Sequence, residues 1–284
     1  MSAAALANLS GWVGRTESAE ERIGATPVAM LSALLDRDDP PPREGDALPP
    51  LAHWLHFLPV HRQSELGPDG HARRGGFLPP VPLERRMWAG SRLEFHRALR
   101  IGETARRVST IRSVTVKEGR SGPLVFVTVR HEIAGEAGPA ITDEHDIVYR
   151  DAKGAAVAAP EPAPAGEAWS RDVKPDPVLL FRYSALTHNG HRIHYDHPYA
   201  AAVEGYPGLV VHGPLVATLL LDLLRRQRPG ADIAAYAFRA RRPLLDIHPF
   251  TLCGVADEGA RQARLWTRDA EGALTMDATA TWRP

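Results

Sequence analysis

The sequence predicts an α+β fold in which an antiparallel sheet wraps around one central helix, and it predicts this unit twice. Short blocks of alternating or β-branched residues, divided by glycine, proline and charge, fill 88–149 and return in 234–282, as in antiparallel meanders. Residues 215–224 form a helix that is apolar nearly all round, so it must be buried. Each half places a helix before its meander, and Arg97-Ala-Leu loosely matches Arg242-Pro-Leu just before a strand. A sheet wrapped around one apolar helix, present twice, is a double hotdog.

In the first half, Ser18-x-x-Glu21 has the spacing of a capping box and predicts the start of a helix. That helix should run through 26–35, because apolar side chains recur along one of its faces. Prolines make 38–50 a loop, and 53–60 is an apolar segment of strand or buried-turn character. The strands expected after it are 92–96, 106–116, 124–133 and 144–149.

Residues 151–177 are rich in proline and alanine and have no periodicity, which predicts a linker. It would divide an N-terminal unit, 1–150, from a C-terminal unit, 178–284. The C-terminal unit should open with a strand at 178–183, and Gly213-Pro214 should begin its buried helix, since proline suits a first helical turn. A short helix at 198–204 and strands at 234–239, 250–255, 263–267 and 275–282 complete this half.

The composition excludes several classes of protein. Lys plus Arg and Asp plus Glu both number 34, so nothing favours binding to nucleic acid through bulk charge. Cys253 is the single cysteine, so the chain forms neither an internal disulfide nor a thiolate-rich zinc site. The N-terminus lacks a signal-peptide pattern, and no apolar run approaches the ~20 residues of a membrane span. We therefore expect a cytoplasmic protein that binds neither membranes nor nucleic acid.

The stretch 187–200, THNGHRIHYDHPYA, contains four histidines among fourteen residues. It lies in an irregular segment before the buried helix, where binding residues are common. A metal site, an acid/base site and a solvated loop rich in histidine would each explain it. His191-x-x-His194-x-Asp196 offers three metal ligands, but this spacing matches no common zinc signature. That mismatch weighs against a metal and leaves the other two explanations.

Residues 187–196 align without gaps on the hydratase motif of MaoC-like hotdog enzymes, S/T-G-D-x-N-P-x-H-x-D, and the flanking FRYSAL and VVHGPL are similar to the same family. The chain most resembles the double-hotdog branch that acts on branched C5 dicarboxylic acyl-CoA thioesters, such as mesaconyl-CoA and itaconyl-CoA. The resemblance covers most of the chain and is densest from Phe181 to Leu224. It implies a catalytic hotdog in 178–284 and a degenerate one in 1–150, which supports the sheet and helps to shape the acyl pocket.

By this resemblance His194 is the catalytic histidine, and Gly213 carries the amide that polarises the thioester carbonyl. Asn189 stands where most of the family has a catalytic aspartate. Water addition needs a base, a proton for the α-carbon and donors for the enolate oxygen, which histidine and a helix N-terminus can supply. Because an amide accepts no proton at neutral pH, Asn189 leaves the usual acid/base pair with one certain member. Asn189 could hold the water while His194 moves the protons.

The neighbouring residues each have two interpretations. Arg192, where the family has proline, is either a loop anchor or the bidentate partner of a substrate carboxylate, and we favour the second. Asp196 either orients the catalytic histidine or is itself the second acid/base group. His191 contacts the substrate or only shapes the loop. His188 and His197 are expected to be solvated.

The resemblance implies a hydro-lyase, an acyl-CoA hydratase/dehydratase that works without a cofactor or metal. A hotdog thioesterase is one alternative, although such enzymes generally use a carboxylate on the central helix and 215–221 has none. A non-catalytic acyl-CoA-binding protein is the other, because of Asn189. The expected partner is an acyl-CoA thioester, a homodimer is left open, and the segment 88–92 could approach the ligand.

Overall fold

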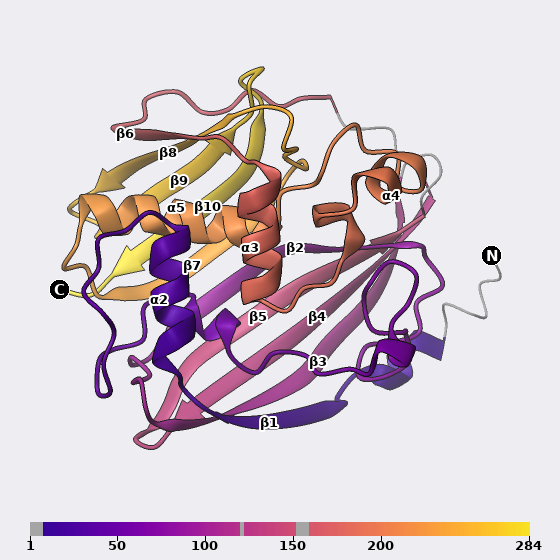
Figure 1. Cartoon of the computed structure of the whole chain (residues 1–284), viewed down its shortest axis with the longest axis horizontal. Coiled ribbons are helices and arrows are strands. Elements are labelled where there is room, and N and C mark those ends of the chain that lie inside the picture. The colour runs from indigo at the N-terminus through magenta and orange to yellow at the C-terminus, as the bar shows by residue number, and fades with distance from the viewer. Residues whose placement is uncertain (1–7, 120–121, 152–158) are drawn as a thin grey trace.

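One continuous antiparallel sheet forms the back of the molecule in the computed structural model, which describes residues 8–119, 122–151 and 159–284 (Figure 1). Its strand order is β1-β3-β4-β5-β2-β7-β10-β9-β8-β6. The strands are β1 (Thr16–Arg22), β2 (Arg85–Phe95), β3 (Thr104–Gly119), β4 (Gly122–Gly135), β5 (Gly138–Arg150), β6 (Trp169–Val173), β7 (Ile233–Ala240), β8 (Phe250–Asp257), β9 (Gln262–Arg268) and β10 (Leu274–Trp282). The strands predicted in both meanders are thereby confirmed.

The pairing of β2 with β7 joins the sheets of the two halves side by side. These are the first meander strands of their halves, and they run antiparallel, with Ser91 opposite Phe238 and Leu93 opposite Tyr236. The backbones approach closely at Gly90, where any side chain would overlap the carbonyl oxygen of Phe238. Glycine is therefore required at this point of the junction.

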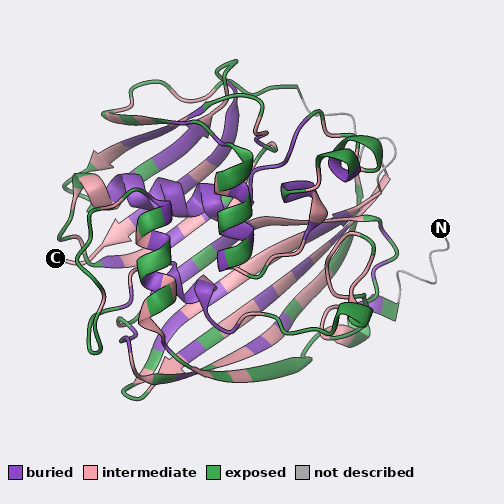
Figure 2. Ribbon diagram, in the orientation of Figure 1, coloured by how far each residue is buried: buried purple, intermediate pink, exposed green. Residues whose placement is uncertain are grey.

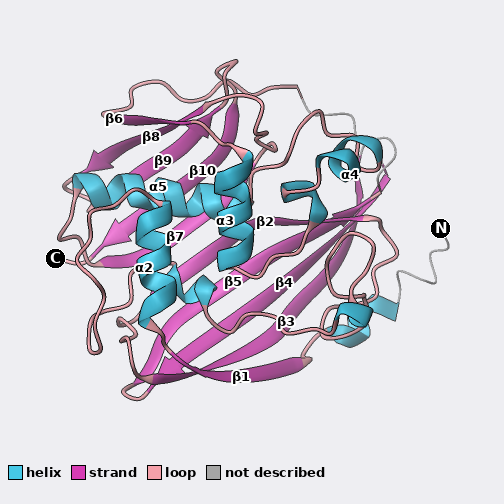
Figure 3. Ribbon diagram, viewed as in Figure 1, coloured by secondary structure: helices cyan, strands magenta, loops and turns pink. Residues whose placement is uncertain are grey.

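The helices α2, α3 and α5 lie on one face of this sheet (Figure 3). In chain order the helical elements are η1 (Asn8–Trp12), α2 (Ala25–Leu34), η2 (Ala52–Leu55), η3 (Gln63–Glu65), α3 (Pro177–Leu186), η4 (Arg192–His194), α4 (His197–Ala202) and α5 (Gly213–Gln227). No helix among the described residues is long and apolar enough to cross a membrane.

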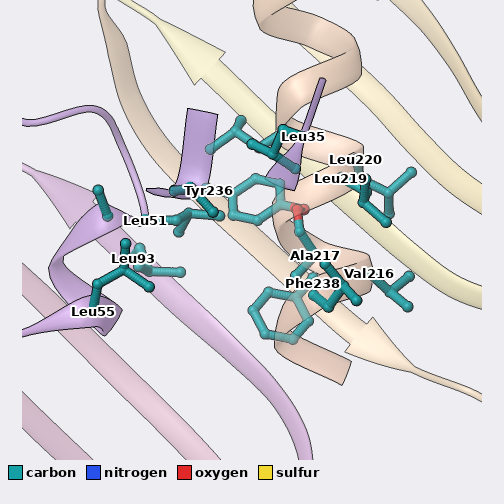
Figure 4. Packing of buried hydrophobic residues seen from close by; sticks show 14 of the residues in the cluster. Leu35, Leu51, Leu55, Leu93, Val216, Ala217, Leu219, Leu220, Tyr236 and Phe238 are labelled. Carbon is teal, nitrogen blue, oxygen red and sulfur yellow. The ribbon is translucent and has the colours of Figure 1, made fainter. Parts of the chain in front are cut away.

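Helix α5 is the centre of the core, as its sequence predicts. Every residue from Leu215 to Leu224 is buried, and the helix stands out as buried in Figure 2. The hydroxyl of Tyr236 donates to the Ala217 carbonyl at 2.8 Å, which fixes the helix on β7. Figure 4 shows that leucines of the first half reach the same apolar cluster, among them Leu35, Leu51 and Leu93.

Asp222 is a buried carboxylate on α5 that three arginines neutralise. Arg37, after α2, lies 2.7 Å from it, Arg171 of β6 lies 3.2 Å away, and Arg226 of α5 lies 2.7 Å away. A buried charge without such partners would be strongly destabilising. The cluster therefore ties three distant parts of the chain to one point on the central helix.

Two predicted elements are wrong. Residues 178–183 belong to helix α3, because Asp176 caps it by accepting from the Leu179 amide at 2.8 Å, and Pro177 occupies its first turn. A short apolar run does not by itself distinguish a strand from a buried helix. Ser18-x-x-Glu21 lies inside strand β1, which pairs with β3, so it is no capping box.

The predicted linker, 151–177, also needs a correction. Its later part contains strand β6, which pairs with β8 and closes one edge of the sheet. Residues 152–158 lie outside the described part of the chain. The division into units 1–150 and 178–284 stays a prediction, with β6 added to the second sheet.

Candidate active site

A cavity of about 1420 Å³ is lined by residues from both halves of the chain. The second half contributes the segment predicted as the hydratase motif and the start of α5. The first half contributes residues from β2 and β5 and from the loop before β2. Lining residues include Asn189, Arg192, Pro214, His71, Trp88 and His145. Trp88 belongs to the segment 88–92 that the sequence placed near the ligand.

The motif loop leaves α3 through a tight turn. His188 has a φ of 49° and its ring Nδ1 meets the Pro59 carbonyl at 3.0 Å. The Asn189 amide N–H donates to the Ser184 carbonyl at 2.8 Å, and its side-chain Oδ1 accepts from the His191 amide at 3.0 Å. Asn189 Oδ1 is thus hydrogen-bonded within the loop. Its side-chain NH₂ group and the second lone pair of Oδ1 are available to a ligand.

His194 is buried and held by a backbone acceptor. Its Nδ1 donates to the Val210 carbonyl at 2.7 Å, and its ring stacks on His212 at 3.6 Å between centroids. Burial lowers the pKa of His194 to about 4, although the bond to Val210 opposes this. The imidazole is therefore neutral near pH 7, and Nε2 is a free acceptor. His212 is fixed in turn by a 2.8 Å hydrogen bond to Ser184.

Gly213 is the first residue of α5, directly before Pro214 in the cavity wall. A Cβ atom at Gly213 would meet only the Trp88 carbonyl oxygen, at 3.7 Å. The amides of a first helical turn have no acceptor within the helix. The α5 N-terminus therefore has what the predicted thioester-polarising role requires.

Arg192 and Asp196 bind each other. Arg192 Nε donates to Asp196 Oδ2 at 2.9 Å, and its guanidinium lies 4.0 Å from the Tyr199 ring. Asp196 Oδ1 caps α4 by accepting from the Tyr199 amide at 3.1 Å. Arg192 also donates to the Pro68 carbonyl at 3.0 Å. These contacts favour the loop-anchor interpretation of Arg192 and give Asp196 a structural partner instead of His194.

His191 lies between His194 and a histidine that the sequence analysis missed. Its ring centroid is 5.4 Å from that of His194 and 4.1 Å from that of His71. Burial, followed by the two neighbouring imidazoles, lowers the pKa of His191 to about 2. His71 is hydrogen-bonded to Asp69, with Nδ1 3.2 Å from Oδ2. The predicted triple His191, His194 and Asp196 is therefore not the group that gathers here.

Asp69, His71 and His191 bring their polar atoms within 4.8 Å of one another, the spacing of a potential metal site. The hydrogen bond from the His71 ring occupies the Asp69 carboxylate, as in an Asp–His dyad. Asp69 and His71 lie in a Gly-Pro-Asp-Gly-His turn far from the motif in sequence. Polar residues in that turn were the one signal that could have drawn attention to them.

The first half adds a second polar cluster to the cavity wall. Asp143 Oδ2 lies 2.7 Å from His145 Nε2 and 3.2 Å from His53 Nε2, and it accepts from the Trp54 indole at 2.8 Å. Burial would raise the pKa of Asp143, but the two imidazoles bring it well below its usual value. This half was predicted to be a degenerate hotdog that helps to shape the acyl pocket. The half does contribute polar side chains, from the alternating β5 positions 143 and 145.

The sequence profile of hydroxyacyl-thioester dehydratase type 2 matches residues 51–246. This chain belongs to that family. Mesaconyl-C(4)-CoA hydratase from Chloroflexus aurantiacus is 49% identical to it over 276 residues, which cover 96% of this chain and 97% of that protein.

Two solved structures place this member of the hydroxyacyl-thioester dehydratase type 2 family among hotdog proteins. A MaoC-like dehydratase from Phytophthora capsici has a TM-score of 0.68 at 16% identity, covering 100% of this chain and 99% of that one. A conserved protein of Mycobacterium tuberculosis with a double hotdog fold has a TM-score of 0.56 at 12% identity, covering 95% and 96%. The predicted double hotdog and the MaoC-like resemblance are confirmed.

Proposed function

We propose that this chain is an acyl-CoA hydratase that adds water reversibly to a branched C5 dicarboxylic enoyl-CoA, with mesaconyl-C4-CoA as the first substrate to test. The observation that carries the proposal is the 49% identity to mesaconyl-C(4)-CoA hydratase over 96% of this chain. The cavity supports it, because the amide side chain of Asn189 and the N-terminus of α5 at Pro214 lie along its wall. Itaconyl-CoA, an isomeric C5 thioester, is the second candidate.

In this proposal His194 and Asn189 hold the attacking water. His194 Nε2 accepts a hydrogen bond from it, because Nδ1 is already bound to the Val210 carbonyl. The Asn189 NH₂ group donates to the water oxygen, because Oδ1 is already bound to the His191 amide. The two side chains thus orient a lone pair of the water toward the β-carbon of the enoyl group.

The thioester carbonyl lies at the N-terminus of α5 in this arrangement. As water adds, negative charge develops on this oxygen, and the Gly213 amide stabilises it together with the positive end of the helix dipole. Losing one such donor typically costs about 3–4 kcal/mol of transition-state stabilisation. Pro214 leaves no N–H of its own, so Gly213 is the donor at this end.

The substrate's free carboxylate needs a cation, and Arg192 is already paired with Asp196. Arg86 of β2 also lines the cavity, and it forms no salt bridge within the described residues. It lies beside His71, whose pKa it lowers, second to burial. In a mesaconyl-C4 thioester the carboxylate is on the carbon that receives the hydroxyl. Among the arginines that line the cavity we assign this carboxylate to Arg86, because it lies beside His71 and the motif loop, while Arg192 anchors the loop.

A substrate screen tests the function. Purified protein is assayed with mesaconyl-C4-CoA, itaconyl-CoA, crotonyl-CoA and longer enoyl-CoA compounds, and the loss of enoyl absorbance and the release of free thiol are followed together. We expect water addition to the C5 dicarboxylic thioesters without thiol release. Thiol release would instead support the thioesterase alternative, which needs a carboxylate at the site. Absence of both reactions would leave a binding protein.

The two arginines provide a matched specificity test. Arg86→Gln should raise KM for mesaconyl-C4-CoA by about tenfold or more while crotonyl-CoA, which lacks the carboxylate, changes little. Arg192→Ala should reduce activity on both substrates alike, because it loosens the loop. The assignment is wrong if Arg192→Ala alone discriminates between the two substrates.

A homodimer and a cytoplasmic location stay predictions. Light scattering of the purified protein and fractionation of the source cells would check them.

A further inference from the structure

The water-activating pair of the motif is incomplete in this chain. Asn189 cannot accept a proton at neutral pH, and its Oδ1 already accepts from the His191 amide. Asp196, the other carboxylate of the motif, is bound to Arg192 and to the Tyr199 amide. Of the two buried imidazoles of the motif, His191 has its pKa lowered to about 2 and His194 to about 4, so His194 is the better proton acceptor. Its burial disfavours the imidazolium, so His194 alone is a weak base.

The first half places a carboxylate–imidazole pair next to this loop. Asp69 holds His71 at two points: Oδ1 accepts from the His71 amide at 3.1 Å, and Oδ2 meets ring Nδ1 at 3.2 Å. Bonding at Nδ1 leaves Nε2 of His71 as the free ring nitrogen. His71 lines the cavity, and its ring lies 4.1 Å from that of His191.

The loop carrying His71 is locked to the motif loop by its backbone. Gly70 has a φ of +88°, and a side chain there would overlap the Gly190 carbonyl oxygen. The Arg192 amide donates to the Asp69 carbonyl at 3.0 Å, and the Arg192 guanidinium donates to the Pro68 carbonyl at 3.0 Å. Two loops from different halves therefore form one rigid unit, the support that a catalytic group needs.

We propose that His71 is the second acid/base catalyst of the site, with Asp69 as its positioning residue, in place of the aspartate that Asn189 replaces. The inference rests on the proposed hydratase function. Asp69 is on the far side of the ring from Nε2, so it can stabilise the imidazolium that forms there, as the carboxylate of a catalytic triad does.

The proton and electron balance is as follows. Nε2 of His71 takes one proton from the water as the water oxygen bonds to the β-carbon, and the π-electron pair moves through the α-carbon to the thioester oxygen. The Gly213 amide holds this enolate. The imidazolium of His71 then gives the same proton to the α-carbon, the enolate returns its electron pair, and the dyad regains its starting state. His194 holds the other hydrogen of the water throughout.

The charges around His71 act on its pKa in opposite directions. Burial lowers the pKa of His71, Arg86 and Arg74 add to the lowering, and Asp69 opposes it. Burial would raise the pKa of Asp69, but its bonds to His71 keep it well below its usual value, with His191 contributing. Asp69 is thus the neighbouring charge that favours the imidazolium of His71, from its position against Nδ1.

The test measures kcat and KM for mesaconyl-C4-CoA hydration in the wild type, His71→Gln, Asn189→Asp and the double variant, with folding checked by circular dichroism. His71→Gln should lower kcat by about 10²–10⁴-fold, the usual loss for a general acid/base, with KM changing less than about threefold. Asn189→Asp in the His71→Gln background should recover tenfold or more in kcat, because it restores a carboxylate where the family has one. His96→Gln, at an exposed histidine outside the cavity, is the matched control.

Several outcomes would overturn the proposal. A folded His71→Gln with kcat within about threefold of wild type excludes His71 as a catalyst, and so does a loss confined to KM. An acid limb of the kcat/KM pH profile that stays the same without His71 also excludes it, as does activity that chelators remove and a divalent metal restores. If His71→Gln fails to fold, Asp69→Asn decides: a tenfold loss in kcat supports the dyad, and an unchanged kcat rejects it. A wild type that hydrates none of the thioesters rejects the proposed function instead, so the two failures are distinguishable.

Discussion

Helices α2 and α5 occupy corresponding places in the two halves, yet only α5 is wrapped by its sheet. Helix α5 packs on β8, β9, β10, β6 and β2, whereas the main contacts of α2 are with α3 and η2. Met30 of α2 is 49% exposed, and the exposed face of α2 is visible in Figure 2. Part of the first sheet is thereby left to line the cavity, with side chains such as Asp143 and His145. A duplicated fold can thus use one copy for its core and the other for its binding site.

The largest effect should come from the motif in the second half. His194→Ala should lower kcat by about 10²-fold or more without unfolding the protein, because the water loses the acceptor that fixes its position. Asp196→Asn should keep the cap on α4 and most of the activity, because its partners are Arg192 and the Tyr199 amide. Steady-state kinetics and thermal melts of both variants check this. The reverse order of activity losses would mean that Asp196, and not His194, acts on the water.

The two helices should also differ in stability. Leu220→Ala in α5 should cost about 2–5 kcal/mol of unfolding free energy, because Leu220 is fully enclosed by sheet and helix. The cost of Leu31→Ala in α2 should lie at or below the lower end of this range, because α2 packs mainly on α3 and η2 and is not wrapped by a sheet. Urea unfolding of both variants measures the difference. Equal costs would show that the two helices are embedded alike.

The smallest predicted effect concerns stability, because the free energy of unfolding should decrease only gradually as the pH falls below neutrality. Burial lowers the pKa of His194 to about 4 and that of His191 to about 2, from 6.5. Below about pH 6.5 the unfolded chain takes up protons that the folded chain refuses, so stability is constant above this pH and falls as the pH decreases. Urea unfolding at several pH values down to about pH 5 measures this slope.

His191→Gln is the matched variant for the acid effect, and it should flatten the slope. A slope that is unchanged would mean that His191 is protonated in the folded protein.

The fold was largely predictable because its signals are local. The apolar run 215–224 and the alternation in 88–149 reflect burial directly. Residues 178–183 were misassigned because an apolar run of that length suits a strand or a helix, and the decisive Asp176-Pro177 start was overlooked. The spacing of Asn189 and His194 predicted the C-terminal part of the candidate site, and their catalytic roles stay predictions.

The remainder of the site was not predictable from spacing. Asp69 and His71 reach His191 only through the packing of Gly70 on Gly190, between loops far apart in the chain. Arg192 pairs with Asp196 in the structure. The sequence left open whether Arg192 binds the substrate and whether Asp196 orients His194. Such features depend on tertiary contact, which a motif does not encode.

The pairing of β2 with β7 also means that the two halves cannot be separated, or replaced independently of each other, without exposing a strand edge. Each half taken alone would present a long strand with unpaired amides and carbonyls, the kind of edge that recruits other chains into aggregates. Since each strand covers the edge of the other, neither half can be exchanged for a distant homologue unless its partner strand still fits. A substitution on one side of this junction, as at Gly90, has to be tolerated by Phe238 on the other. The two hotdogs are therefore expected to fold and to tolerate substitution as one unit.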